Sequence, residues 1–194
     1  MTMSDIFGSY RPLSASTAVS LPTDGVLVVG FTGSPASQRA LDTVCATAGP
    51  GLRIALVCAI DPIRPPAPAT FLHDALKSEA YLLSDRAVID ELLRRGMESV
   101  RGTCRARVTG VALEGDPVRV LAGAVARFDA AEVVVGMSGT RPTGQVRHIA
   151  RALPDDVPLL VTNGERHVRL RRRTRDHVPV RPFVPGHLGR AAGV

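Results

Sequence analysis

Hydrophobic residues occur along this chain in short apolar runs that alternate with segments of helical spacing. The first run, residues 25–31, is apolar at nearly every position and ends at turn-forming residues, which predicts a strand buried on both faces. Runs at 52–60, 131–136 and 157–162 repeat this pattern, whereas residues 105–113 alternate between polar and apolar, as expected of a strand at a sheet edge. The pattern therefore predicts five strands.

Helices are predicted between these strands. Ser34 and Asp116 are each followed by proline, a typical helix start, because the side chain accepts from free N–H groups and proline needs no partner there. A long amphipathic helix is predicted over 71–101 and a short one through 149–153. Strands that alternate with crossover helices require a parallel sheet covered on both faces, so we predict an α/β three-layer sandwich.

Positive charge is concentrated near the carboxyl end of the chain. The net charge is +6, and residues 164–194 hold eight of the 24 basic residues but only two of the 18 acidic ones, which leaves residues 1–163 neutral. We predict a flexible leader over 1–22, one domain over 23–163 and a disordered, Arg-rich, proline-containing tail over 164–194. Six tail arginines are candidates for nonspecific binding of an anionic partner such as nucleic acid: Arg166, Arg169, Arg171, Arg172, Arg173 and Arg175.

The remaining composition excludes several classes of protein. No apolar run approaches the roughly 18 residues that a membrane span needs, and residues 1–21 lack the pattern of a secretory signal, so a cytoplasmic location is predicted. Cys45, Cys58 and Cys104 have no metal-ligand spacing, and we interpret them as small core residues of a protein from a reducing compartment.

No catalytic or metal-binding constellation is predicted. Ser138 lies in Gly-Met-Ser-Gly, which falls one residue short of the nucleophile elbow of α/β-hydrolases, and no Gly-Lys-Ser/Thr follows a glycine loop. The tail histidines recur at intervals of ten, a spacing that places them on one face of neither a helix nor a strand.

Three motifs follow one another along the chain. They are the apolar strand into Thr-Gly-Ser-Pro with Arg-Ala-Leu in the next helix (28–41), Glu-Gly-Asp-Pro (114–117), and Ala-Glu-Val-Val-Val-Gly-Met-Ser-Gly (131–139). In this order and spacing they resemble the universal stress protein family over about residues 23–163. The resemblance implies an open five-stranded parallel sheet of order 3-2-1-4-5, a Rossmann-like fold of the adenine nucleotide hydrolase type, and a homodimer.

The implied strand order also locates a candidate pocket. The winding direction changes between the first and fourth strands, and ligands of open α/β sheets bind outside the carboxyl ends of the strands at that point. The resemblance implies ATP or another adenine nucleotide as the ligand, with loop glycines that let backbone N–H groups approach phosphate. The candidate nucleotide-binding residues are Phe31, Thr32, Gly33, Ser34, Val135, Gly136, Ser138 and Gly139.

Two departures from the family's nucleotide motif argue against ATP. Thr32 stands where ATP-binding members carry aspartate, and Ile149 and Ala150, which come after nine residues that follow Gly139, stand where those members carry a Gly-Ser or Gly-Thr pair. Candidate substitutes for the missing anion contacts are Arg147, His148 and Arg151. We therefore hypothesise a non-catalytic binding and regulatory domain with a degenerate nucleotide pocket. The alternatives are an ATP-binding member with slow or no hydrolysis and a protein that binds nucleic acid through its basic tail.

Overall fold

A central sheet organises the chain in the computed structural model, which describes residues 10–16, 19–60 and 73–172. Its five parallel strands are β2 (Gly25–Gly30), β3 (Leu52–Ile60), β4 (Arg107–Glu114), β5 (Ala130–Gly136) and β6 (Leu159–Thr162). They lie in the order β6-β5-β2-β3-β4, with β2 paired to both β3 and β5. This arrangement confirms the predicted order 3-2-1-4-5, in which β4 forms one edge of the sheet.

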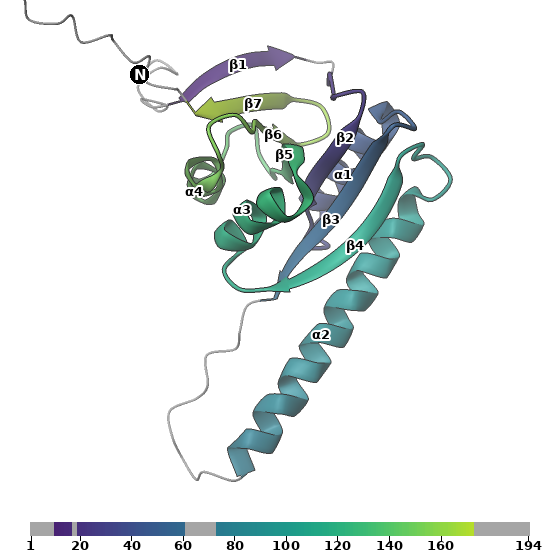
Figure 1. The fold of residues 1–194 in the computed structure, drawn as a ribbon, viewed down its shortest axis with the longest axis vertical. Coiled ribbons are helices and arrows are strands. Elements are labelled where there is room, and N and C mark those ends of the chain that lie inside the picture. Colours follow the sequence, from purple (N-terminus) through teal and green to yellow (C-terminus); the bar gives the residue numbers. More distant parts are fainter. Residues whose placement is uncertain (1–9, 17–18, 61–72, 173–194) are drawn as a thin grey trace, which may run out of the picture.

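Helices cover both faces of the sheet and complete a three-layer sandwich (Figure 1). One face is covered by α1 (Pro35–Thr47) and α2 (His73–Val100), and the other by α3 (Pro117–Phe128) and α4 (Gly144–Ala152). The long amphipathic pattern after β3 is thus one continuous helix, α2, which extends beyond the sheet in Figure 1. Among the described helices none is both long and apolar enough to cross a membrane.

Two hydrophobic cores explain why the parallel strands are apolar at consecutive positions. In β2, Leu27 and Val29 face α1 and α2, whereas Val28 faces α3 and α4, because successive side chains of a strand point to opposite faces. All three side chains are fully buried. The strands therefore need apolar residues on both faces, which is the property that made them recognisable in the sequence.

The predicted helix starts are confirmed in atomic detail. Ser34 Oγ accepts from the backbone N–H of Ser37 at 3.3 Å, and Asp116 Oδ1 accepts from those of Val118 and Arg119 at 3.0 and 3.2 Å. Each cap satisfies N–H groups that the first turn of a helix leaves without an intrahelical partner.

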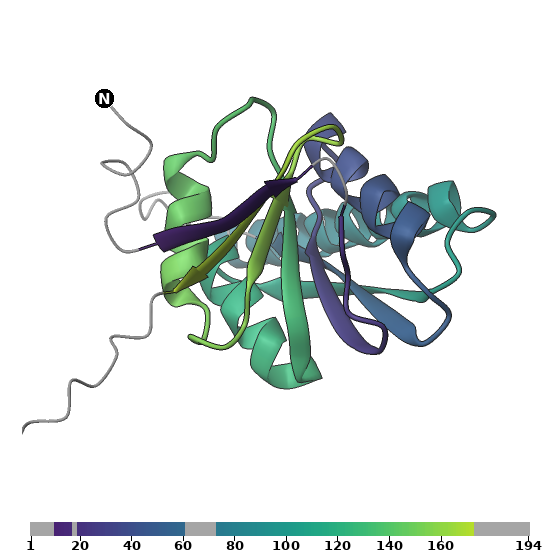
Figure 2. The same ribbon diagram turned by 90° about the horizontal axis from the view of Figure 1, so that it is seen from above.

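Two further strands lie in segments that the sequence predicts to be flexible or disordered, and they correct the predicted domain limits. β7 (His167–Arg172) pairs antiparallel with β6, and β1 (Tyr10–Ser16) pairs antiparallel with β7 (Figure 2). Val168 and Leu170 of β7 are 8% and 2% exposed and belong to the core under α3 and α4. Residues 167–172 alternate between polar and apolar, so one face of this Arg-rich segment can be buried.

Tail arginines in β7 are held by the domain. Arg169 donates from Nε and Nη2 to the two carboxylate oxygens of Glu132 at 2.6 and 3.0 Å, and also donates to the carbonyl oxygen of Ser20. Arg171 donates to the carbonyl oxygens of residues 155–156, each at 3.5 Å. The prediction that these arginines belong to a disordered arm is therefore wrong.

The other arginines of the predicted tail have different positions. Arg166 is exposed in the turn before β7, and Arg172 ends that strand. Arg173, Arg175 and the rest of residues 173–194 lie outside the described residues, as do residues 1–9 of the predicted leader.

Candidate functional site

A pocket of ≈ 190 Å³ opens at the carboxyl ends of β2, β3 and β5, where the winding direction of the sheet reverses. Its floor is formed by Gly30 at the end of β2, Val57 and Ala59 of β3, and Val135 and Gly136 of β5. Parallel strands end at the same edge, so the fold brings together residues that are about a hundred positions apart in the sequence.

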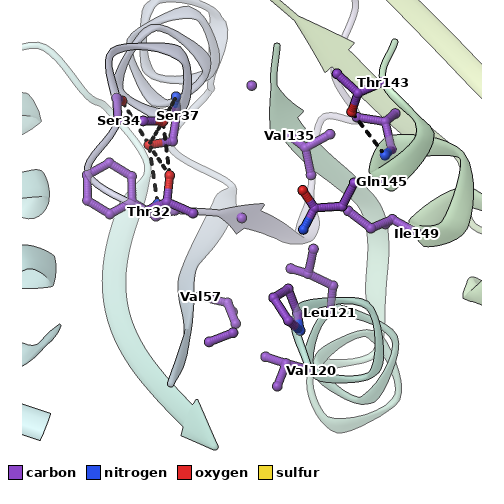
Figure 3. A pocket seen from close by; sticks show the side chains of 16 residues that line it. Thr32, Ser34, Ser37, Val57, Val120, Leu121, Val135, Thr143, Gln145 and Ile149 are labelled. Carbon is purple, nitrogen blue, oxygen red and sulfur yellow. Dashed lines mark hydrogen bonds between the residues drawn. The ribbon is translucent and has the colours of Figure 1, made fainter. Parts of the chain in front are cut away.

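Hydroxyl groups form one wall of the pocket (Figure 3). Thr32 Oγ1 donates to Ser34 Oγ at 2.9 Å, and the backbone N–H of Thr32 donates to Ser37 Oγ at 3.2 Å. The Ser37 hydroxyl, which is 4% exposed, donates in turn to the carbonyl oxygen of Ser34 at 3.0 Å. Hydrogen bonds thereby join the loop after β2 to the first turn of α1 in one polar surface.

The opposite wall is apolar and comes from α3 and α4. Val120 and Leu121 of α3 and Ile149 of α4 line it, and all three are buried. The side chain of Gln145, from the first turn of α4, lies between the two walls and points toward the centre of the pocket (Figure 3). The pocket is therefore an apolar slot with hydroxyls on one side and one amide directed toward its centre.

Three helices begin beside the pocket, but they offer different numbers of N–H groups. At the start of α3 the carboxylate of Asp116 accepts from the N–H groups of the first turn. At the start of α1 the Ser34 hydroxyl accepts from one N–H group, and the first helical residue is a proline, which has none. At α4 the Thr143 hydroxyl caps the N–H of Val146 at 3.5 Å, which leaves the earlier N–H groups of Gly144 and Gln145 outside the cap. Of these two residues Gln145 lines the pocket, so its N–H group and the positive end of the α4 dipole are the features that could receive an anion there.

Gly136 is required by a close approach of backbone segments. A Cβ atom at this position would lie 2.1 Å from the carbonyl oxygen of Ala36, so any other residue would push β5 away from the first turn of α1. Gly136 thus lets the hydroxyl wall stand directly beside the end of β5.

None of the described residues that line the pocket has an ionisable side chain. The substitute cations Arg147, His148 and Arg151 do not line it, and no group of three or more His, Cys, Asp or Glu residues in the described part of the chain could hold a metal ion. The hydroxyls of the wall bond to one another and to backbone, so the described residues give none of them a general base.

The structure brings together five of the eight predicted site residues: Phe31, Thr32, Ser34, Val135 and Gly136. Gly33, Ser138 and Gly139 do not line the pocket. Gly33 has a φ of +68° and faces α2, where an added Cβ would lie 2.2 Å from Leu92 Cδ1. Gly139 instead accepts at its carbonyl oxygen from Asn163 Nδ2 at 3.4 Å.

Sequence reasoning missed the contributions of α3 and α4 and one hydroxyl of α1. Ser37 could have been found from its position three residues after the cap Ser34, where the N–H contacts the cap. No sequence motif indicated that Thr143 and Gln145 line the pocket, because their position in the structure depends on where α4 begins.

The start of α4 also corrects the alignment of the glycine motif. Ile149 and Ala150 lie inside α4, five and six residues after its first residue Gly144, and both are 5% exposed. Thr143 caps α4 and Gly144 is its first residue, so the helix begins earlier after Gly139 than the nine intervening residues of the family motif would place it. Ile149 is therefore part of the apolar wall of the pocket. It does not stand in the place of a phosphate-binding turn.

Strand order, helix placement and a pocket at the reversal of winding define an open, doubly wound α/β domain. The model of the universal stress protein family matches residues 25–151, and the chain belongs to this family. The sequence-based resemblance is thus confirmed.

Two solved structures illustrate the shared fold. A universal stress protein in complex with cAMP is 21% identical, with 73% of this chain and 99% of that chain covered and a TM-score of 0.51. The universal stress protein UspA from Lactobacillus plantarum is 12% identical, with 72% and 99% covered and a TM-score of 0.53. A search of curated proteins gives no significant match.

Proposed function

We propose that this chain is a non-catalytic binding domain whose pocket takes a small adenine nucleotide with a single phosphate. The observation that carries the proposal is the absence of ionisable side chains among the described residues that line the pocket. Hydrolysis needs a positioned acid, base, activated nucleophile or metal, and the described lining offers only hydroxyls, one amide and apolar groups.

The shape of the pocket supports a flat, largely apolar group as the part of the ligand that is enclosed. A volume of ≈ 190 Å³ lies below the about 300–1,000 Å³ typical of sites that enclose a whole drug-sized ligand. A purine base would fill the slot between Leu121 and the hydroxyl wall, with its ring edge in reach of Gln145. The sugar and phosphate would then lie at the mouth of the pocket.

Electrostatics support one phosphate and not three. Sites for triphosphates neutralise them with Lys, Arg or Mg²⁺, whereas the described lining of this pocket offers the N–H group of Gln145 and the dipole of α4. The structure of a universal stress protein with cAMP, a nucleotide with a single phosphate, supports the same ligand class.

Isothermal titration of the full chain with AMP, cAMP and Mg²⁺-ATP tests the proposal, together with an assay for phosphate release from ATP. We expect AMP or cAMP to bind, ATP to bind about tenfold more weakly or worse, and no phosphate to be released. Gln145→Arg should shift the preference toward ATP by adding a cation in the pocket, and Ala59→Phe should block all three ligands by filling the floor.

Gly139→Ala is the matched control for both variants, because an added Cβ meets nothing within 4 Å and Gly139 does not line the pocket. Tightest binding of ATP, or its turnover, would contradict the proposal in favour of the ATP-binding alternative. Failure of all three nucleotides would refute the ligand class.

The regulatory role, the homodimer and the cytoplasmic location implied by the family resemblance and the composition stay predictions. Light scattering on the full chain tests the homodimer, with a mass of twice 20.5 kDa as the expected result.

A further inference from the structure

Two arginines of neighbouring strands lie side by side on the face of the sheet that carries α3 and α4. In the parallel pairing of β3 with β4, Arg53 and Arg107 are register partners, and the backbones of neighbouring strands are about 4.8 Å apart. Ala55 of β3 and Val111 of β4 pack into the core under α3 and α4. Side chains an even number of positions apart along a strand share a face, so both arginines belong to that face as well.

Neither guanidinium group has a partner among the described residues. Both arginines are exposed, and no ion pair or side-chain hydrogen bond joins them to the described part of the chain. Arg53 is the one exposed residue of β3, a strand with a neighbour on each side. Like charges directly opposite each other on neighbouring strands lower stability. The fold therefore holds two positive charges together where no described acid neutralises them.

The two arginines line one surface groove of ≈ 230 Å³ near the amino-terminal ends of β2, β3 and β4. Thr109 adds one hydroxyl group, and the described lining contains no acidic side chain. The rest of the described lining is apolar and consists of Val26, Ile54, Ala55, Val111 and Phe128. The groove thus combines an apolar surface with two cations, at the opposite ends of the strands from the candidate nucleotide pocket.

Phe128 is the aromatic residue of the groove and the last residue of α3. Its ring packs against the core and is partly buried. The guanidinium carbon of Arg127 lies 5.5 Å from the centroid of this ring, within the range of a cation–π contact. A third positive charge is therefore held beside the groove.

We propose that this groove binds a small phosphate monoester that carries an apolar or aromatic body. A phosphate monoester has a charge of about −1.5 to −2 at pH 7, which matches the two guanidinium groups. Arginine donates to phosphate oxygens through two parallel N–H groups, so each guanidinium can bind the ester in this way. The body of the ligand would cover Val26, Ala55 and Phe128 and displace water from them.

The size of the groove supports a small ligand, because ≈ 230 Å³ is below the about 300–1,000 Å³ typical of sites for drug-sized molecules. The proposal does not depend on what the nucleotide pocket takes, since the two sites share no lining residue.

NMR titrations of the isotope-labelled full chain test the proposal with three probes. Phenyl phosphate has both the head group and the aromatic body, inorganic phosphate has only the head group, and benzyl alcohol has only the body. We expect phenyl phosphate to shift the amide signals of residues 53–55, 107–111 and 128, with a Kd of about 1 mM or tighter. Inorganic phosphate should bind about tenfold more weakly, because it leaves the apolar lining in water. Benzyl alcohol, which has no charge for the arginines, should also bind about tenfold more weakly.

Variants assign the binding to the two arginines. Arg53→Met and Arg107→Met should each weaken phenyl phosphate about tenfold, because each removes a charged donor and keeps an apolar stem. Arg101→Met is the matched control: it also removes one exposed charge, but Arg101 lines a groove on the other face, beside α2. This control should bind phenyl phosphate like the original chain. Melting curves show that each variant is folded, and removal of one of two facing like charges should leave the Tm unchanged or raise it.

Ala59→Phe separates the groove from the nucleotide pocket, because it fills the floor of that pocket and leaves the groove intact. Phenyl phosphate should still bind this variant, and loss of binding would place the probe in the nucleotide pocket and overturn the proposal. Three other results would also overturn it: no binding of phenyl phosphate, equal affinity for inorganic phosphate, or variants of Arg53 and Arg107 that bind as well as Arg101→Met. Failure of the nucleotides to bind would not change any of these outcomes, so the two proposals fail independently.

Discussion

His167 lies at the start of β7, 6% exposed, with its imidazole Nδ1 2.7 Å from Thr162 Oγ1. Thr162 Oγ1 also accepts from the backbone N–H of Gly164 at 3.0 Å, so the imidazole is held against a hydroxyl group that is itself fixed by the backbone. Burial lowers the pKa of His167, because the charged imidazolium loses its hydration.

A buried neutral histidine makes stability depend on pH in a defined window. The unfolded chain binds the proton at a pKa of about 6.5, whereas the folded chain binds it at a lower pKa, so stability is lost as pH falls below about 6.5. We expect the free energy of unfolding of the original chain to fall relative to His167→Gln between pH 7.5 and 5. Urea denaturation at several pH values measures it. A difference that does not change with pH would show that His167 takes up its proton without cost.

At the scale of elements, β7 is held to the domain by one ion pair as well as by its strand pairing. Glu132 of β5 is 2% exposed and has Arg169 of β7 as its bidentate partner, across the intervening strand β6. Burial raises the pKa of the Glu132 carboxyl, and the guanidinium of Arg169 opposes that shift. Without the guanidinium, the carboxylate would be left buried and unpaired.

Arg169→Met should therefore lower the free energy of unfolding by about 3 kcal/mol at pH 7. The double variant Glu132→Leu, Arg169→Met should recover most of this loss, because it removes the stranded charge as well. In the folded Arg169→Met protein the pKa of Glu132 is raised still further, because the opposing guanidinium is gone. The loss of unfolding free energy relative to the original chain should therefore shrink as pH falls toward 5 and the carboxylate takes up a proton. Urea denaturation of the three proteins measures these differences. A double variant as unstable as Arg169→Met would mean that packing of the arginine stem, and not the charge, holds β7.

The same elements show what the sequence could and could not predict. The parallel strands and the capped helices were predictable because burial on both faces and cap chemistry are local properties. β7 was missed because the density of arginine in 166–175 outweighed the alternation of Val168 and Leu170, and because nothing local indicates that Glu132 is buried. β1 contains Pro12, which argues against a central strand but is compatible with the edge position that it occupies.

The candidate site also has parts that the sequence could predict and parts that it could not. The loops after β2 and β5 were predictable from the strand order and the family resemblance. The apolar wall and Gln145 were not, because the residue at which α4 begins decides which turn of this helix faces the pocket.

At the scale of the whole molecule, the sheet joins the two ends of the described chain. β1 precedes the parallel core in sequence but pairs with β7, so it covers an edge that β7 would otherwise present to solvent. The pocket lies at the ends of β2, β3 and β5, whereas β1 lies at the edge of the sheet beyond β6 and β7. Ligand binding and edge protection are therefore separate properties of the fold.

Deletion of residues 1–16 should separate these two properties. Removal of β1 leaves the unpaired N–H and C=O groups of β7 exposed, and an exposed strand edge is a template for pairing with another chain. We expect the truncated protein to remain folded, to bind the same nucleotide as the full chain within about threefold, and to associate more strongly as its concentration rises. Size-exclusion chromatography with light scattering measures the association. Deletion of residues 1–9 is the control, because it leaves β1 in place and should behave like the full chain. Loss of nucleotide binding in the longer deletion alone would mean that β1 supports the pocket through the sheet.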